Sequence, residues 1–235
     1  MGFDISYHPM REEEIQVCFL DLRQDRAARS AIFDRFQLDA QDRHTVGQLL
    51  DIEFENSSFN DNLGFCLAAV AGYYRKYWYL RGSACSFVIN RFPEFVRYTR
   101  SWNELIPPGQ LGEWENTLGA NYRVGCYLSE AGVVALLSDL DRCPNVASIM
   151  ASAFSHGRLA VFRKALAYAA EHRTGLIEAS EIVEPHPLDL GASGFATKAD
   201  HCEMEGIALY MADAIDQIST ATTTATRNKP CRLLH

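Results

Sequence analysis

The chain lacks the short motifs that mark common catalytic and nucleotide-binding sites. It contains no GxxxxGK[ST] loop and no GxGxxG loop, so no motif supports the binding of nucleotide phosphates. No GxSxG elbow is present, which removes the usual sign of a serine hydrolase. The seven cysteines form no CxxC pair and are odd in number, so the sequence predicts neither a zinc site of spaced pairs nor a disulfide framework.

Basic charge is scarce as well. The chain has 30 acidic and 22 basic side chains, a formal net charge of -8. Nucleic acid is therefore not an expected partner, because phosphate binding requires a basic face. A basic protein partner is compatible with this charge, since complementary charges steer association. The first residues show no signal peptide, and scattered thiols are typical of a reducing compartment, so we expect a cytoplasmic location.

The densest aromatic region, residues 59–108, predicts a central core helix. One stripe at helical spacing consists of Leu63, Leu67, Val70, Tyr74, Tyr77 and Trp78. A second stripe at spacing four holds Gly64, Ala68 and Gly72, and its small side chains allow a neighbouring element to approach closely. Arg75 and Lys76 interrupt the apolar run before the roughly 20 residues that a membrane span needs. We therefore expect no membrane-spanning helix.

The remaining periodicity predicts a mainly helical α+β fold, with a helical core and a few short strands. Helices are expected over residues 12–22, 28–36, 42–54, 130–140, 144–154, 159–169 and 207–218. Strands are expected over 3–8, where Pro9 would end the strand, and over 122–128 and 176–184. Residues 1–218 are expected to form one domain, and the low-complexity residues 219–235 a disordered tail.

One group of residues has the chemistry of a metal site but not its spacing. It comprises His186, His201, Cys202, Glu203 and Glu205. Zinc needs three or four converging ligands, usually supplied by spaced pairs, and the adjacent His201 and Cys202 point apart on most backbones. We therefore predict no metal and no cofactor. A small cytosolic hydrolase with a metal or acid–base site around His186 and His201 is the alternative that these residues leave open.

Three regions of the sequence carry a resemblance to a known family. They read MGFDISYHP at the start, WYLRGSACSF with SWNELIP in the middle, and GLIEASEIVEPHPLDLG near the end. Together they resemble bacterial immunity proteins that accompany type VI secretion effectors, and the nearest resemblance is to the partner of a cytosol-acting nuclease. The resemblance implies a protein that is not an enzyme and that binds and neutralises a cognate toxin. It assigns no role to any residue.

Acidic side chains suit such an inhibitor, because they can imitate the phosphates of a nuclease substrate. The candidate partner-binding residues are Glu53, Glu55, Asp61, Glu113, Glu115, Glu181 and Glu184. The inhibitor would block either the active site of the toxin or its active conformation. A homodimer is also compatible with the sequence, and a homo-oligomeric scaffold that only contacts proteins is a further alternative.

Overall fold

The computed structural model describes residues 3–53, 60–108 and 118–227. Its centre is a six-stranded sheet in the order β3-β4-β5-β1-β2-β8. The strands are β1 (Ile5–Met10), β2 (Tyr77–Tyr79), β3 (Thr99–Arg100), β4 (Val124–Leu128), β5 (Gly175–Ser180) and β8 (Cys202–Glu203). Neighbours pair antiparallel except β2 and β8, which are parallel. A separate hairpin pairs β6 (Val183–Glu184) with β7 (Gly194–Phe195).

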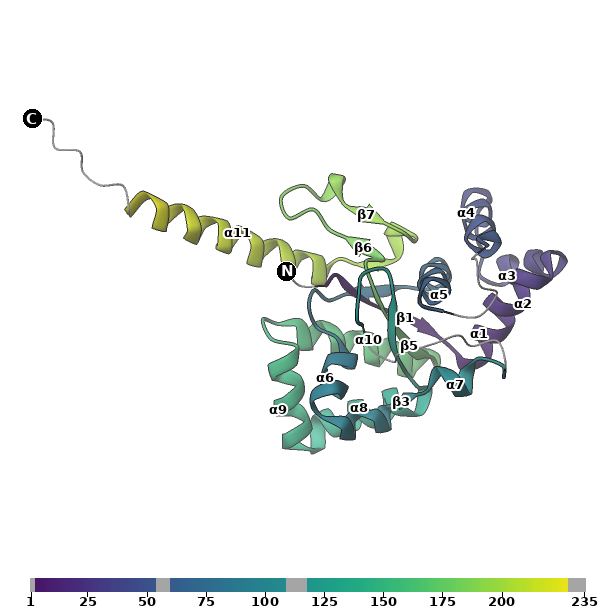
Figure 1. Cartoon of the computed structure of the whole chain (residues 1–235), viewed down its shortest axis with the longest axis horizontal. Helices are drawn as coiled ribbons and strands as arrows, with labels where there is room; N and C mark the ends of the chain where they lie inside the picture. The colour runs from purple at the N-terminus through teal and green to yellow at the C-terminus, as the bar shows by residue number, and fades with distance from the viewer. Residues whose placement is uncertain (1–2, 54–59, 109–117, 228–235) are drawn as a thin grey trace, which may run out of the picture.

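Helices cover both faces of the sheet (Figure 1). One face carries α1 (Glu12–Ile15), α2 (Asp21–Gln24), α3 (Arg29–Arg35), α4 (Ala40–Asp51) and α5 (Asp61–Tyr74). The other carries α6 (Cys85–Arg91), α8 (Glu130–Arg142), α9 (Pro144–Ala153) and α10 (Arg158–His172), and α7 (Trp102–Leu105) lies near the end of the sheet. The mainly helical α+β class predicted from the sequence is confirmed.

Two apolar cores result because successive strand residues point to opposite faces. Tyr77 and Tyr79 belong to the core beneath α5, whereas Trp78 between them belongs to the core beneath α8 and α10. On β1, Tyr7 joins the α10 core and Met10 the α5 core. The sheet is thus buried on both sides, and its position is determined by large side chains from both helical layers.

The central helix is shorter than predicted. α5 ends at Tyr74, and Arg75 is already extended with φ −151° and ψ 164°. Tyr77 and Trp78 therefore lie in β2, and their predicted place on the helical stripe was wrong. Aromatic residues favour a pleated surface, and here the sheet supplies a partner on each side of them.

Two strand boundaries also differ from the prediction. Pro9 lies inside β1 rather than ending it, because β2 pairs only with Ser6 and Tyr7, and β1 has no partner strand on that side at Pro9. The strand predicted over 176–184 breaks at Glu181, whose φ of 60° is left-handed, and continues as β6.

The predicted helix starts are confirmed on the second face. Ser129 caps α8 by accepting a hydrogen bond from the backbone N–H of Gly132, and Pro144 occupies the first turn of α9. The last helix, α11 (Glu205–Arg227), projects from the body and continues past residue 219, where the tail was expected to begin (Figure 1). Extending an existing helix costs less than nucleating one. In the described ranges, no helix combines the length and apolarity needed to cross a membrane.

The predicted close approach at the small-residue stripe is present at Gly72. A Cβ built there would lie 2.4 Å from Oγ1 of Thr197, whose hydroxyl donates to the Ala69 carbonyl at 2.6 Å. Gly47 of α4 has no atom within 4 Å of the same position. The two glycines thus form a matched pair, one crowded and one open.

We predict that Gly72→Ala lowers the free energy of unfolding by about 1–3 kcal/mol, because Thr197 must move and its hydrogen bond is disturbed. Gly47→Ala should instead raise it by about 0.5–1 kcal/mol, the usual gain of alanine in a helix. Urea titration of both variants measures this. Equal effects in the two variants would contradict the close packing of Gly72.

Candidate functional site

The structure describes only part of the predicted acidic contact set. Glu55, Glu113 and Glu115 lie outside the described residues. Asp61 is the first residue of α5, and its side chain is likewise not described. Glu53 follows α4 and is exposed, and its role as a contact stays a prediction. The remaining two predicted residues, Glu181 and Glu184, lie together where β5 passes into the β6–β7 hairpin.

Glu181 forms a carboxyl pair with Asp4. Its backbone N–H donates to the Asp4 carbonyl at 2.7 Å, and the Asp4 N–H donates to Oε1 of Glu181 at 3.4 Å. The Asp4 carboxylate also accepts from the Tyr79 hydroxyl and, at 2.6 Å, from Nη1 of Arg81. Burial, followed by the nearby Asp4 carboxylate, raises the pKa of Glu181 to about 7. Glu181 is 8% exposed, so it offers a partner far less surface than the sequence suggested.

Glu184 is exposed at the end of β6 and accepts a hydrogen bond from the Tyr122 hydroxyl at 3.0 Å. It belongs to a wider acidic segment that sequence reasoning missed. Residues 181–218 contain eight Asp and Glu residues and a single Lys, a formal charge of -7 out of -8 for the chain. The eight acids are Glu181, Glu184, Asp189, Asp200, Glu203, Glu205, Asp213 and Asp216. A charge count by segment would have found them.

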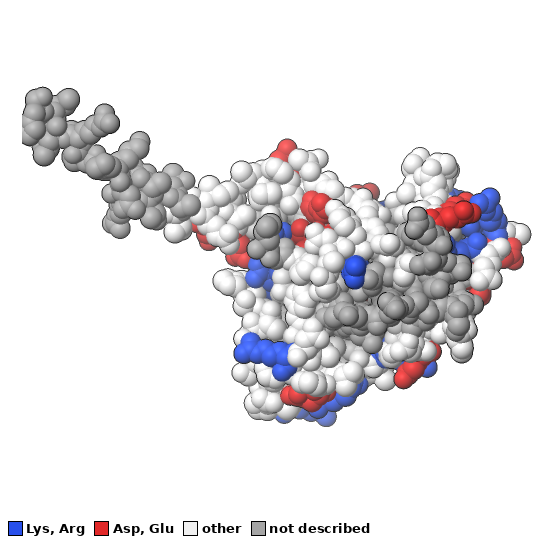
Figure 2. Space-filling view, viewed as in Figure 1, with Lys and Arg blue, Asp and Glu red and all other residues white. Residues whose placement is uncertain are grey.

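Part of this charge is neutralised by the body of the protein. Glu203 pairs with Lys76, Glu205 with Lys164, and Asp213 with Arg158. Four further acids are exposed and form no ion pair within the described ranges: Glu184, Asp189, Asp200 and Asp216. Figure 2 shows acidic side chains along the base of α11 and over the β6–β7 hairpin. We call residues 181–218 the acidic segment.

The acidic segment also exposes apolar side chains. The part of the chain that the structure describes has ten exposed large hydrophobic residues, and five of them lie between residues 188 and 218. These five are Leu188, Leu190, Met204, Ile215 and Ile218. Ile215 and Ile218 lie one helical turn apart on α11, on either side of Asp216 in the sequence. Adjacent exposed apolar residues beside polar ones are typical of protein-binding surfaces.

A cleft of about 700 Å³ runs along α11. Its walls come from the turn at residues 81–83, from the connection between α9 and α10, and from α11. Within it, Nδ1 of His156 lies 4.0 Å from Oδ1 of Asp213, while Nη2 of Arg158 donates to Oδ2 of the same carboxylate at 2.5 Å. Because Arg158 already holds the Asp213 carboxylate, this group is an ion pair with a histidine beside it.

The two histidines of the alternative hydrolase site each form a hydrogen bond with the backbone. Nδ1 of His186 accepts the N–H of Asp189 at 3.0 Å, and Nδ1 of His201 contacts the Gly72 carbonyl at 3.0 Å, which requires this nitrogen to donate. Cys202 is buried, and burial raises its pKa to about 12. Across the described ranges, no three His, Cys, Asp or Glu side chains are arranged to hold a metal ion.

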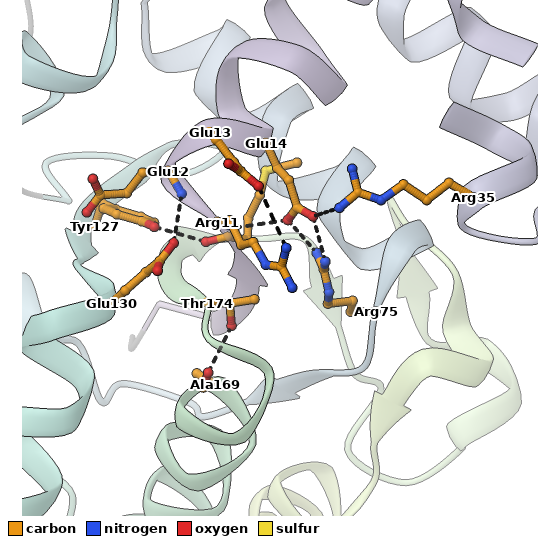
Figure 3. A network of polar contacts seen from close by, with 11 residues as sticks. Arg11, Glu12, Glu13, Glu14, Arg35, Arg75, Tyr127, Glu130, Ala169 and Thr174 are labelled. Atoms are coloured by element: carbon orange, nitrogen blue, oxygen red, sulfur yellow. Dashed lines mark hydrogen bonds and ion pairs between the residues drawn. The ribbon is translucent and has the colours of Figure 1, made fainter. Parts of the chain in front are cut away.

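A second polar cluster surrounds Glu14, which is only 1% exposed (Figure 3). Arg75 donates to both carboxylate oxygens at 2.7 and 2.8 Å, Arg35 donates at 2.7 Å, and the Arg11 N–H at 3.0 Å. The arginine bonds lower the pKa of Glu14 against the opposing effect of its burial. The donors come from the residue before α1, from α3 and from the residue after α5, so the cluster links three helices of one layer. From the sequence, Glu14 was only one of three acids in a first helical turn.

Comparisons of the chain with models of protein families, with curated proteins and with solved structures found no match.

We predict that Glu14→Ala lowers the free energy of unfolding by about 3–5 kcal/mol, because it leaves the Arg75 guanidinium, 12% exposed, without a counter-charge. Glu13→Ala is the matched control: its side chain is 70% exposed and should cost less than about 0.5 kcal/mol. Guanidinium chloride titration distinguishes the two. A cost for Glu14→Ala no larger than that for Glu13→Ala would show that the cluster does not stabilise the fold.

The pKa of Glu181 predicts a pH dependence of stability. Its folded value of about 7 lies above the ordinary 4.5, so between these values the folded state holds a proton that the unfolded state has lost. The stability contributed by this proton is complete below the lower value and is lost as pH rises through about 7. Glu181→Gln should flatten this slope and be more stable than wild type at about pH 8.

Thermal unfolding across this pH range measures the effect, with Glu184→Gln at the neighbouring exposed carboxylate as control. If the Glu181→Gln slope equals that of wild type, the carboxyl pair does not hold a proton.

Proposed function

We propose that the chain is an immunity protein that binds and neutralises the cognate effector of a bacterial secretion system, a toxin that acts in the cytoplasm on nucleic acid. The observation that carries this proposal is the acidic segment, which combines nearly all of the net charge with half of the exposed large apolar side chains that the structure describes. The resemblance of three sequence segments to type VI immunity proteins supports the same function.

The chemistry of the segment matches a basic protein. A nuclease holds its substrate with cationic side chains, because the phosphate backbone dominates the binding of nucleic acid. Glu184, Asp189 and Asp216 present carboxylates that can occupy the same cationic groups. Ile215 and Ile218 supply the apolar contact that excludes water from such an interface. Like charge opposes pairing of this segment with a second copy, so a homodimer would use another surface.

In this proposal, α11 and the β6–β7 hairpin contact the toxin while the sheet and its helical layers hold them in place. Glu53 remains an expected contact from the α4 side. Cytoplasmic residence is part of the proposal, and the six cysteines in the described ranges are free thiols, as a reducing compartment would keep them.

Co-expression with the toxin candidate encoded beside this chain tests the function. We expect growth to be rescued and a complex to form with nanomolar affinity or better, about −12 kcal/mol. The double reversal Asp189→Lys with Asp216→Lys should slow association by about tenfold at low salt, and the loss should shrink as salt rises. Stopped-flow mixing of the purified proteins measures the rate.

The control is Glu94→Lys with Glu171→Lys, which changes the net charge equally at exposed acids outside the segment. If both double variants slow association equally, the change in net charge explains the effect, and the acidic segment is not part of the interface. Folded protein that neither rescues growth nor forms a complex would end the immunity proposal. Substrate turnover that is lost in His186→Ala or His201→Ala would establish the hydrolase instead.

A further inference from the structure

A second cavity, of about 420 Å³, lies between α6 and α9 and does not belong to the acidic segment. Its α6 side is formed by Phe87 and Val88, and its α9 side by Ile149, Ser148 and Ser152. Ser148 and Ser152 are exposed and lie one helical turn apart on α9. The volume lies within the range of small-molecule sites, and the walls have the usual mixture of apolar groups and a few polar ones.

The cavity has one charged group, and that group lacks a counter-ion. Arg91 is the last residue of α6, and its guanidinium carbon lies 5.4 Å from the centroid of the Phe92 ring, which also lines the cavity. Among the residues that the structure describes, no carboxylate forms an ion pair with Arg91. Two other arginines, before and after α6 in the sequence, have ion-pair partners: Arg81 pairs with Asp4 and Arg97 with Asp139.

These features indicate which kind of ligand the cavity would bind. An apolar wall binds a ring or a short chain, and a single guanidinium matches one carboxylate through two parallel hydrogen bonds. The hydroxyls of Ser148 and Ser152 can donate to the same anion. A ligand with several negative charges would find only one cation here, and a cation would be repelled by it.

We propose that this cavity binds a small organic monoanion, in which an apolar body carries one carboxylate. The body lies between Phe87 and Ile149, and the carboxylate contacts Arg91. This binding does not rest on the proposed immunity function, because none of the residues that line the cavity comes from the acidic segment, although the cavity adjoins the cleft along α11 at Gly82 and Ala153.

The test uses the full chain and two probes of the same shape, naphthoate and the neutral naphthamide, in isothermal titration. We expect naphthoate to bind saturably with one site and at least about tenfold more tightly than naphthamide, the usual gain of a hydrogen bond to a charged group. Arg91→Gln should weaken naphthoate by about tenfold and leave naphthamide unchanged. Arg142→Gln, at another exposed arginine without an ion pair in the described ranges, should change neither.

Ser152→Trp is designed to fill the cavity and should abolish the binding of both probes. If that variant does not fold, the exposed Arg91→Gln variant still decides the question. The proposal is overturned if naphthoate does not saturate the wild-type chain, if naphthamide binds equally well, or if Arg91→Gln behaves like Arg142→Gln.

Discussion

The buried carboxylate of Glu14 is the contact on which the helical layer over one face of the sheet depends. It joins α1 to α3 through Arg35 and to the end of α5 through Arg75, 61 residues away in the chain. A carboxylate in this position is tolerated only because three donors replace its hydration. Arg75 is also the residue at which α5 ends: its backbone is extended, and the next residues enter the sheet as β2.

The opposite face of the sheet contains a buried carboxylate whose pKa is shifted in the opposite direction. Glu178 of β5 accepts from the Tyr7 hydroxyl at 3.0 Å and from the backbone N–H groups of Cys85 and Ser86 at the start of α6. Its donors are neutral, so burial dominates and raises its pKa, whereas the arginines lower that of Glu14. Glu178 thus links β5 to the start of α6 through neutral donors, whereas Glu14 links the helices of the other layer to one another through an ion pair that requires both charges.

The elements that could be predicted from the sequence are those whose signal is local. Ser129 and Pro144 mark helix starts by their own chemistry, and the apolar stripe of α5 is visible at its spacing. Tyr77 and Trp78 misled the prediction because their place depends on β1, which lies far away in the chain. The site follows the same rule. The sequence shows that Glu184 is acidic, and this residue is exposed. The burial of Glu181 depends on its pairing with Asp4, which is distant in the chain and is not indicated by any local pattern.

Residues with strained backbone conformations border the acidic segment. Of the five non-glycine residues with left-handed φ in the described ranges, three border this surface: Tyr122, which binds Glu184; Glu181 itself; and His156 beside Asp213. Such conformations cost of order 1–3 kcal/mol each and persist where the surrounding structure imposes them. Glu181 adds the cost of a carboxyl whose pKa is raised by burial. These three residues therefore fix the backbone at the edge of the acidic segment, next to the carboxylates of Glu184 and Asp213.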